Sequence, residues 1–548
     1  MKLQRIADII GPIMVGPSSS HTAGALRIAS MARRLSAGTP ARVEFKLYGS
    51  FAHTYHGHGT DRALVGGILG MAADDLRIRT SFELAREAGI DVAITPLPDA
   101  PYDHPNTVDV LMTDADGTTV AVRGVSIGGG AAVLTQINGV DVYITGESAS
   151  VIVRHRDTVG VLAHITQSVS LFGGNIATLK SYREKHGGTA YTVLELDSML
   201  SDVAREAMLV HPHILDVRAI PADGPAEEVS EPDEDAEHEL ETLDFMTGQA
   251  LLAYCDEHAV SIADAFRARE DAIGRAQGKP FDLDAYLARV FDVMKASATE
   301  PVEAPVKTMG GLIGGESYAI AQLEREGRGV ATGQMATVTR YAMAVLETNA
   351  AMGRIVAAPT AGSSGVLPAV LLTLAEEGAY SEEQIADALV CAAAVGCLIT
   401  RNATVAGAEG GCQAEIGAAA AMAAAAAVQL AGGTPAQCLA AASNAIANML
   451  GLVCDPIAGL VEVPCQKRNA SGAACALVSA QIALAGIENL VNFDESVDAL
   501  YRVGRALPFE LRESALGGLA AEPSACKWCE SFMCASHADD IASALTTE

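Results

Sequence analysis

The chain has no cysteine in its first 254 residues, although 11 occur among its 548 residues. It also has no apolar run of the roughly 20 residues that a membrane-spanning helix needs. The longest candidate, residues 418–432, consists mostly of alanine and predicts a close-packed core helix, so we expect no membrane partner. Basic residues are scarce, with 37 Lys and Arg against 67 Asp and Glu. A nucleic-acid partner is therefore not expected, because phosphate binding needs clustered basic residues.

The N-terminal 20 residues have only a short apolar run and no signal-cleavage pattern. We therefore expect a cytoplasmic protein, in which thiols stay reduced and a disulfide framework is disfavoured. The cysteines then become candidate core residues or metal ligands.

Three cysteines differ from the others in their surroundings. Cys412, Cys454 and Cys465 lie in the Gly-containing segments GGCQAEIG and GLVCDPIAGLVEVPCQKRN, beside polar residues. Such segments are typical of irregular backbone at a functional site. Thiolates hold iron–sulfur cubanes, and a cluster with three of them leaves one iron open to act as a Lewis acid. Free cysteine is also a common core residue, so the spacing alone leaves both interpretations open.

An acidic stretch, residues 223–242, divides the chain. It contains almost no large apolar residue, so we predict a flexible linker. Residues 1–147 mix helical and strand patterns and predict an α+β domain. Residues 243–548 show helical spacing nearly throughout and predict a mostly all-α catalytic domain around a buried site.

Residues 148–222 show strand and helix patterns in the order βαββαβ, which is typical of a ferredoxin-like fold. The segment resembles an ACT domain, a module that commonly binds amino acids between paired copies. The resemblance rests on DTVGVLAHIT and on GGNI, where Gly173 and Gly174 end a helix before Asn175. It implies a homodimer and a regulatory role near Asn175; such domains also serve purely as dimerisation surfaces.

Hydroxyl and histidine side chains precede three predicted helices. GPSSSHTAG places three serines and His21 before a helical run, where free backbone amides bind anions. A helix cap needs only one serine, so an anion site is favoured there. TAGSSG, residues 360–365, predicts a second anion cradle that does not fit a P-loop. YHGHGTD places His56 and His58 before an apolar helix, and a histidine can act as a general base near neutral pH.

Together these motifs resemble the iron–sulfur L-serine dehydratases, also called L-serine ammonia-lyases. The matching segments are GPSSSHTAG, GHGTD, HPNT, SIGGG, GRIVAAPTAGSSGVLPAVL, CQAEIG and CDPIAGLVEVPCQKRNA, with cysteine intervals of 42 and 11 residues. The resemblance covers nearly the whole chain outside the linker and the extreme C-terminus. In family terms, a β half with an ACT domain is fused to an α half.

The resemblance implies conversion of L-serine to pyruvate and ammonia with a [4Fe–4S] cluster and without pyridoxal phosphate. Cys412, Cys454 and Cys465 would hold three irons, and the fourth would polarise the substrate hydroxyl. His58 would remove the α-proton, with His21 as a second catalytic residue. The resemblance also implies substrate-binding or cleft-lining roles for Ser18, Ser19, Thr22, Thr60, Asp61, Asn106, Ser126, Thr360 and Ser363.

The chain departs from the family pattern near its C-terminal end. Family members can place a C-terminal cysteine over the open iron, but here Cys526, Cys529 and Cys534 are followed by further residues. A CxxC pair can also bind another metal or be redox-active, so capping by the tail is a hypothesis.

Three other functions stay open at this point. The same chemistry could act on L-cysteine or L-threonine, since one methyl group changes binding by only about 1–3 kcal/mol. An amino-acid sensor would use the ACT domain without turnover, which leaves the cysteine and histidine motifs unexplained. A pyridoxal-phosphate enzyme needs a Schiff-base lysine, and Lys467 beside Cys465 has no evident cofactor cradle.

Overall fold

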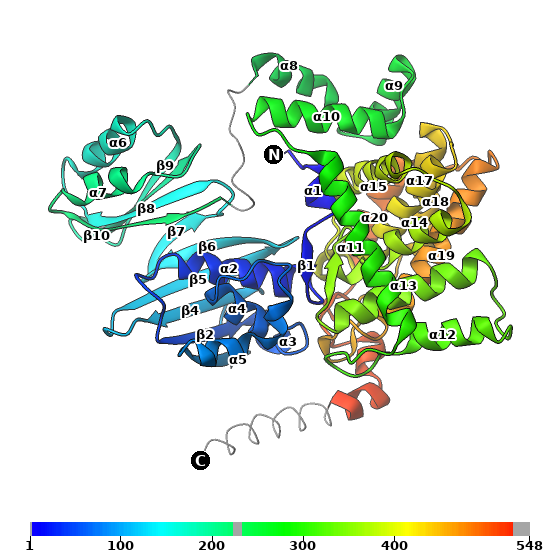
Figure 1. Ribbon diagram of the computed structural model, residues 1–548, viewed down its shortest axis with the longest axis horizontal. Helices are drawn as coiled ribbons and strands as arrows, with labels where there is room; N and C mark the ends of the chain where they lie inside the picture. Colours follow the sequence, from blue (N-terminus) through cyan, green and yellow to red (C-terminus); the bar gives the residue numbers. More distant parts are fainter. Residues whose placement is uncertain (1–2, 223–232, 530–548) are drawn as a thin grey trace. The chain divides into compact units, whose positions relative to one another are not determined.

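The computed structural model describes residues 3–222 and 233–529, which form two units (Figure 1). The sheet unit comprises residues 20–222 and 278–280. The helical unit comprises residues 3–19, 233–277 and 281–529. The mixed α/β N-terminal part and the helical C-terminal part predicted from the sequence are both confirmed.

The first sheet of the sheet unit has six strands in the order β3-β2-β4-β5-β6-β7. Only β2 and β3 are parallel; the other neighbours are antiparallel. Val43, Phe45 and Leu47 alternate as fully buried residues along β2, so one face of the sheet forms a core. The strands are β2 Arg42–Tyr48, β3 Asp91–Leu97, β4 Thr107–Thr113, β5 Thr119–Gly128, β6 Ala131–Ile137 and β7 Val140–Ile144.

Helix α2 (Gly24–Arg33) packs on β5 and β6 and against α4 (Thr60–Ile68). Its buried residues include Leu26 and Ile28, and a Cβ on Gly67 of α4 would lie 2.4 Å from the carbonyl oxygen of Leu26. Glycine therefore allows the two helices to approach closely. The shorter helices of this layer are α3 (Gly49–Thr54) and α5 (Ser81–Glu87).

The second sheet has four antiparallel strands in the order β11-β8-β10-β9. The elements follow one another as β8 (Ala149–Arg156), α6 (Val161–Leu171), β9 (Ile176–Arg183), β10 (Thr189–Leu196), α7 (Asp202–Leu209) and β11 (Ile214–Ile220). This is the βαββαβ order of elements that the residue pattern predicts. Val153, Ile165, Leu194 and Met208 meet in a core between the sheet and its two helices.

The helical unit is centred on α17 (Ala418–Leu430), in which every residue except Gln429 is buried. It packs against α14, α15, α18 and α19, because alanine side chains let neighbouring helices approach closely. The core helix predicted at this alanine run is confirmed. The other long helices are α9 Gly248–His258, α10 Ile262–Ala276, α11 Leu283–Glu303, α12 Glu316–Arg325, α13 Gln334–Ala350, α14 Val366–Glu377, α15 Glu382–Asn402, α18 Pro435–Met449, α19 Cys465–Leu484 and α20 Phe493–Ala506.

The N-terminal segment folds with the helical unit rather than with the α+β part to which its sequence position assigns it. Strand β1 (Ile13–Val15) pairs antiparallel with β12 (Arg354–Val356), and α1 (Ile6–Ile9) packs on α15. A charged pair fixes the segment further, since Arg5 Nε lies 2.6 Å from Glu270 Oε1.

Part of the predicted acidic linker is a helix, α8 (Glu234–Leu243), which packs on α10. The prediction of a flexible linker is wrong for these residues. Ala236, Leu240 and Leu243 recur at helical spacing and are buried, so a short apolar face offsets the acidic composition. The remainder of the predicted linker, residues 223–232, lies outside the described residues.

One described helix, α15, has a length and composition that would allow it to cross a membrane. In the structure 72% of its apolar stretch is buried, and it packs on α17 and α10. We therefore interpret α15 as a core helix of the helical unit.

Candidate active site

The three singled-out cysteines come from distant segments of the helical unit and are all buried. Cys412 lies between the short helix α16 (Gly407–Gly410) and a π-helical turn (Gln413–Gly417) that leads into α17. Cys454 follows α18 in an extended segment, and Cys465 is the first residue of α19. The structure thus places all three at ends of helices or on irregular backbone.

Cys412 and Cys454 form a tight group with Glu415. One ligand atom from each lies within 4.8 Å of the others, and the Cys454 sulfur is 3.9 Å from Glu415 Oε2. Cys465 stands outside this tight group. Burial raises the pKa of the Cys465 thiol well above its ordinary value, and the neighbouring Cys412 and Glu415 raise it further. A bound cation would offset this cost, because a metal-coordinated thiol is deprotonated.

Arg468 places a positive charge beside these thiols. Its Nη1 is 3.6 Å from the Cys412 sulfur, donates to the Val453 carbonyl oxygen at 2.7 Å, and lies 2.7 Å from Asp455 Oδ1. The other Asp455 oxygen accepts the Leu519 backbone N–H at 2.7 Å. Arg468 therefore holds the backbone next to Cys454 and places a hydrogen-bond donor beside the Cys412 sulfur.

Glu513 is brought to the same place by backbone pairing. Its N–H donates to the Cys454 carbonyl oxygen at 2.8 Å, and the Cys454 N–H donates to Leu511 at 2.9 Å. Burial raises the pKa of Glu513 to about 8, with a smaller contribution from Glu415. A Cβ on Gly407 would lie 2.7 Å from Glu415 Oε2 and 3.2 Å from Glu513 Oε2, so a larger residue there would displace the Glu415 carboxylate.

The hydroxyl turn before α14 reaches the cysteine group through Glu415. Thr360 Oγ1 donates to Glu415 Oε1 at 2.8 Å, and the Thr360 and Ser363 hydroxyl oxygens are 3.0 Å apart. The Gly365 N–H at the start of this helix donates to Asn469 Oδ1 at 3.0 Å, so a side chain already uses one amide of the predicted anion cradle.

A second polar group, built around two histidines, lies in the sheet unit. His21 is in a π-helical turn (Ser19–Ala23) that continues into α2, so Ser19 and Ser20 lie within the first helical turn and only Ser18 precedes it. Its Nδ1 is 2.9 Å from Ser20 Oγ, and its Nε2 is 2.8 Å from Ser50 Oγ. The ring centroids of His21 and His58 are 4.5 Å apart.

His58 is 1% exposed, and neither of its ring nitrogens has a hydrogen-bond partner among the described residues. Burial lowers the pKa of His58 to about 4, so its imidazole is neutral near pH 7. Thr22 Oγ1 donates to the His58 carbonyl oxygen at 2.7 Å. The next residue, Gly59, has a positive φ of 60° and directs the chain into α4. The buried hydroxyl of Thr60 likewise has no partner within the described ranges.

The other predicted residues of the sheet unit divide into two groups. Ser126 donates to the Ser20 carbonyl oxygen at 2.8 Å, and its N–H donates to the Asn106 carbonyl oxygen at 3.0 Å, so both join the histidine group. Asp61, at the start of α4, lies 3.2 Å from His56. The side chain of His56 is 45% exposed, so this histidine is partly solvated.

Three predicted residues lie elsewhere. Ser18 and Ser19 are buried at the end of the N-terminal segment that folds with the helical unit. Asn175 is exposed in the second sheet region and donates to Asp197 Oδ2 at 2.7 Å.

Comparison with known proteins places the chain in a family. A model described as Serine dehydratase alpha chain matches residues 257–520, and one described as Serine dehydratase beta chain matches residues 6–96. The L-serine dehydratase alpha chain of Peptoniphilus asaccharolyticus is 43% identical over 287 residues, covering 52% of this chain and 98% of its own length. The chain belongs to the L-serine dehydratase family.

Relatives of both types cover the chain. The beta chain of Peptoniphilus asaccharolyticus is 42% identical over 202 residues, or 37% of this chain and 91% of its own length. The L-serine dehydratase of Streptomyces coelicolor is 31% identical over 531 residues, or 94% of this chain and 98% of its own length. Beta-chain and alpha-chain regions of the L-serine dehydratase family are therefore fused here.

The cysteine group and the histidine group fall in different family matches. The alpha-chain match contains the three cysteines and the Thr360 turn, whereas the beta-chain match contains His21 and His58. Cys526 is exposed and Cys529 partly so; both follow the end of the alpha-chain match. Cys534 lies outside the described residues, and the tail-capping hypothesis stays a prediction.

Three residues of this candidate site, Glu415, Arg468 and Glu513, were not predicted from the sequence. Arg468 lies three residues after Cys465, one turn along α19, which is a signal that helical spacing could have supplied. Glu513 lies 59 positions from Cys454 and reaches it only through backbone pairing, so no local pattern indicates its place.

Proposed function

We propose that the chain converts L-serine to pyruvate and ammonia with a [4Fe–4S] cluster held by Cys412, Cys454 and Cys465, and without pyridoxal phosphate. Family membership supports serine dehydration. The observation that carries the cluster proposal is the convergence of buried free thiols from separate segments beside the Arg468 cation.

The chemistry of the donor set fits an iron–sulfur cluster. Thiolates are its ordinary ligands, and a nearby hydrogen-bond donor to a ligand sulfur, here Arg468, tunes such a cluster. When bound, the cluster would supply a Lewis-acidic iron that makes the substrate hydroxyl a better leaving group.

The chain's own proton acceptor in this proposal is His58. Its buried imidazole is neutral, and neither nitrogen is occupied by a described residue, so it can take the α-proton of serine. Loss of that proton and of the β-hydroxide, which together make one water, leaves aminoacrylate; this tautomerises to the imine, which hydrolyses to pyruvate and ammonia. His21 packs against the His58 ring, and Thr22 holds its backbone, so both would orient the base.

Substrate orientation is the proposed role of the hydroxyl and amide groups. Ser18, Ser19 and Thr60 would hold the serine carboxylate, and Asn106, Ser126, Thr360 and Ser363 would line the site. The buried hydroxyl of Thr60, which has no partner among the described residues, supports its assignment most directly.

The cluster proposal is tested by replacing each proposed ligand with serine, one at a time, in anaerobically reconstituted protein. We expect Cys412→Ser, Cys454→Ser and Cys465→Ser to lower the iron content and the visible cluster absorption. Cys475→Ser, at a partly buried helical cysteine, is the matched control and should retain both. Unchanged iron content in all three ligand variants would contradict the proposal.

Regulation, assembly and location extend the proposal. We propose that residues 148–222 form an ACT-like regulatory module that pairs two chains, supported by the βαββαβ order and the β11-β8-β10-β9 sheet. Exposed apolar residues on and beside its helices, such as Leu162, Leu171 and Val203, support a homodimer. Cytoplasmic residence is proposed because cysteine ligands of a cluster need a compartment in which thiols stay reduced. Light scattering of the full chain tests the dimer.

A further inference from the structure

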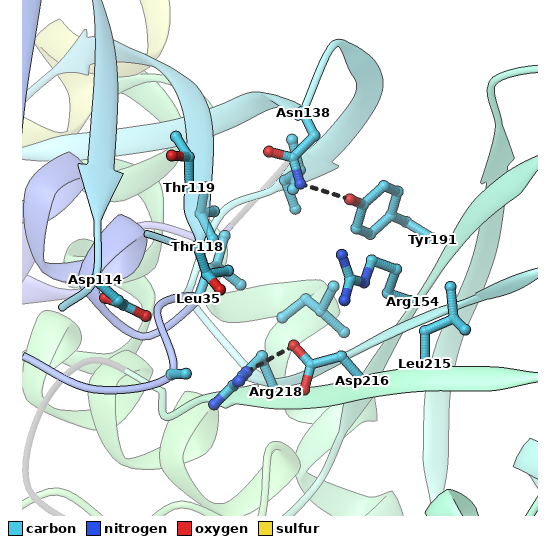
Figure 2. A pocket seen from close by; sticks show the side chains of 14 residues that line it. Leu35, Asp114, Thr118, Thr119, Asn138, Arg154, Tyr191, Leu215, Asp216 and Arg218 are labelled. Atoms are coloured by element: carbon cyan, nitrogen blue, oxygen red, sulfur yellow. Dashed lines mark hydrogen bonds and ion pairs between the residues drawn. The ribbon is translucent and has the colours of Figure 1, made fainter. Parts of the chain in front are cut away.

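Two neighbouring cavities lie in the sheet unit, lined by strands of both sheets and by the chain just after α2. The first has a volume of about 250 Å³ and is shown in Figure 2. The second, of about 310 Å³, is lined by the C-terminal end of α2, by α7 and by β11. Arg218 on β11 lines both cavities, so they form adjoining parts of one region.

Arginine is concentrated around these cavities, although the whole chain has a formal net charge of −30. The cavity walls carry five guanidinium groups against three carboxylates. The residues are Arg33, Arg34, Arg154, Arg205 and Arg218, with Asp114, Asp202 and Asp216. A local excess of arginine in an acidic protein indicates attraction of an anion.

Arg154 is the decisive residue of this region. Its buried Nε has no hydrogen-bond partner within the described parts of the chain, and in Figure 2 it lies between Tyr191 and the Asp216–Arg218 pair without a bond to either. Arg218 Nε donates to Asp216 Oδ2 at 2.8 Å, and Tyr191 already accepts from Asn138 at 2.9 Å. A buried N–H left without an acceptor is costly, and an anion bound at the cavity wall would reduce that cost.

The nearby carboxylate of Asp114 does not neutralise Arg154. Ser36 Oγ donates to Asp114 Oδ1 at 2.6 Å, and no ion pair between Asp114 and Arg154 occurs among the described residues. The positive charge at the cavity wall is therefore available to a ligand.

We propose that the two cavities bind a small dianion carrying phosphate or carboxylate groups, held by Arg154 from the first cavity and by Arg34 and Arg218 from the second. Planar guanidinium groups bind both classes of anion through paired hydrogen bonds. The site is separate from the histidine and cysteine groups, because no residue of those groups lines either cavity.

Helix α2 connects this site to the histidine group. It continues from the turn that carries His21 and ends at Arg33, which lines the second cavity. A helix of ten residues spans about 15 Å, so an anion that draws Arg33 and Arg34 inward would act on the same rigid element that carries His21. The bound anion would therefore change the response to serine; this step alone rests on the proposed function.

Binding is tested by calorimetric titration of the full-length protein, in low-salt buffer, with inorganic phosphate and with succinate. We expect saturable binding of at least one anion, and the anion that binds identifies the class. Arg154→Met and Arg34→Met should each weaken it about tenfold or more. Arg156→Met, at an exposed position of the same strand outside both cavities, should change it less than about twofold.

The outcomes separate this inference from the proposed function. Binding of neither anion, or equal binding by Arg154→Met, Arg34→Met and the parent, would overturn the site whether or not the protein turns over serine. Melting temperatures of the variants confirm folding, since Arg154→Met removes only an unpartnered charge. If an anion binds, a saturating concentration of it should shift the serine concentration for half-maximal rate of the parent by at least about twofold. The same anion should cause no shift in Arg154→Met. No shift in the parent would overturn the regulatory step.

Discussion

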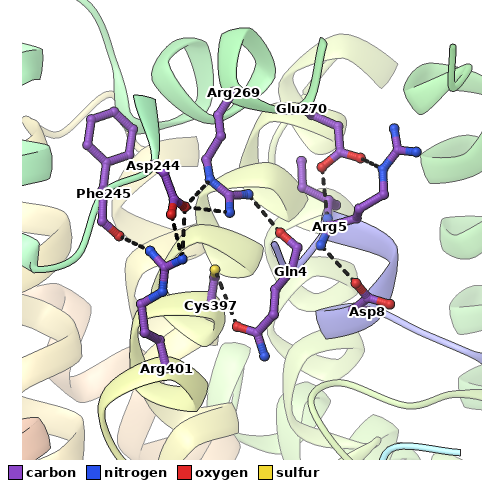
Figure 3. A network of polar contacts seen from close by, with 10 residues as sticks. Gln4, Arg5, Asp8, Asp244, Phe245, Arg269, Glu270, Cys397 and Arg401 are labelled. Carbon is purple, nitrogen blue, oxygen red and sulfur yellow. Dashed lines mark hydrogen bonds and ion pairs between the residues drawn. The ribbon is translucent and has the colours of Figure 1, made fainter. Parts of the chain in front are cut away.

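Replacing Asp244 with asparagine should destabilise the helical unit by about 3 kcal/mol. Asp244 Oδ1 lies 2.9 Å from Arg269 Nη2, and Asp244 Oδ2 lies 2.8 Å from Arg401 Nη2 (Figure 3). The two guanidinium side chains are only 1% and 5% exposed, so asparagine would leave buried positive charge without a counterion. Breaking a buried pair in this way costs about 3–5 kcal/mol.

The lower end of that range applies for two structural reasons. Asp244 is itself 24% exposed, and both arginines keep a backbone partner, with Arg269 donating to Gln4 at 2.7 Å and Arg401 to Phe245 at 2.7 Å. The matched control is Asp271→Asn, whose pair with Arg275 is an exposed helical pair and should contribute about 0.5 kcal/mol.

Urea unfolding followed by circular dichroism measures the difference. The free energy of unfolding falls by about 3 kcal/mol for each molar increase in urea. A loss of about 3 kcal/mol in that free energy therefore lowers the urea concentration at the unfolding midpoint of the helical unit by about 1 M. A shift in Asp244→Asn no larger than that of Asp271→Asn would refute the reasoning.

The same pair predicts a pH dependence. Burial acts to raise the pKa of Asp244, but hydrogen bonds from Arg401 and Arg269 outweigh it and hold the pKa below its ordinary value. The contribution of this ion pair to folding stability is therefore complete above about pH 3.9, the pKa of an aspartate in the unfolded chain. It is lost as the pH falls through the lower pKa that Asp244 has in the folded protein. The parent should lose its advantage over Asp244→Asn below about pH 4; a constant advantage down to pH 2 would contradict this assignment.

Three further predictions concern the polar groups. His58→Gln should lower kcat for serine by about 10²- to 10⁴-fold while leaving the cluster absorption unchanged, and a rate near that of the parent would exclude His58 as the base. Arg468→Met should hasten the loss of cluster absorption in air, because Cys412 loses its cationic donor; an unchanged decay rate would contradict this role. Gly407→Ala should reduce iron incorporation, since its methyl group would displace Glu415, whereas Gly38→Ala, with open space around its Cβ, should leave incorporation unchanged.

The sequence predicted those features that depend on local composition. The alanine run became the buried helix α17, and the alternating and helical patterns of residues 148–222 gave the observed order of strands and helices. Cys412 and Cys454 lie on irregular backbone or at a helix end, as their Gly-containing segments predict, whereas Cys391 is buried within α15. Each of these signals resides in consecutive or helically spaced residues.

Features that depend on distant contacts could not be predicted. The pairing of β1 with β12 joins residues more than 300 positions apart and moves the N-terminal segment into the helical unit. Glu513 enters the cysteine group through a backbone pair with Cys454, and the acidic α8 is stable because its few apolar side chains pack on α10. In each case tertiary packing overrides what local composition indicates.

The most direct test of the proposed cluster enzyme is anaerobic turnover of L-serine by iron-reconstituted protein, with pyruvate and the visible cluster absorption recorded together before and after air is admitted. The account predicts that pyruvate formation rises with iron loading, falls with the cluster absorption in air, and returns after anaerobic reconstitution. A colourless protein that forms pyruvate at a rate indifferent to iron and air would contradict it.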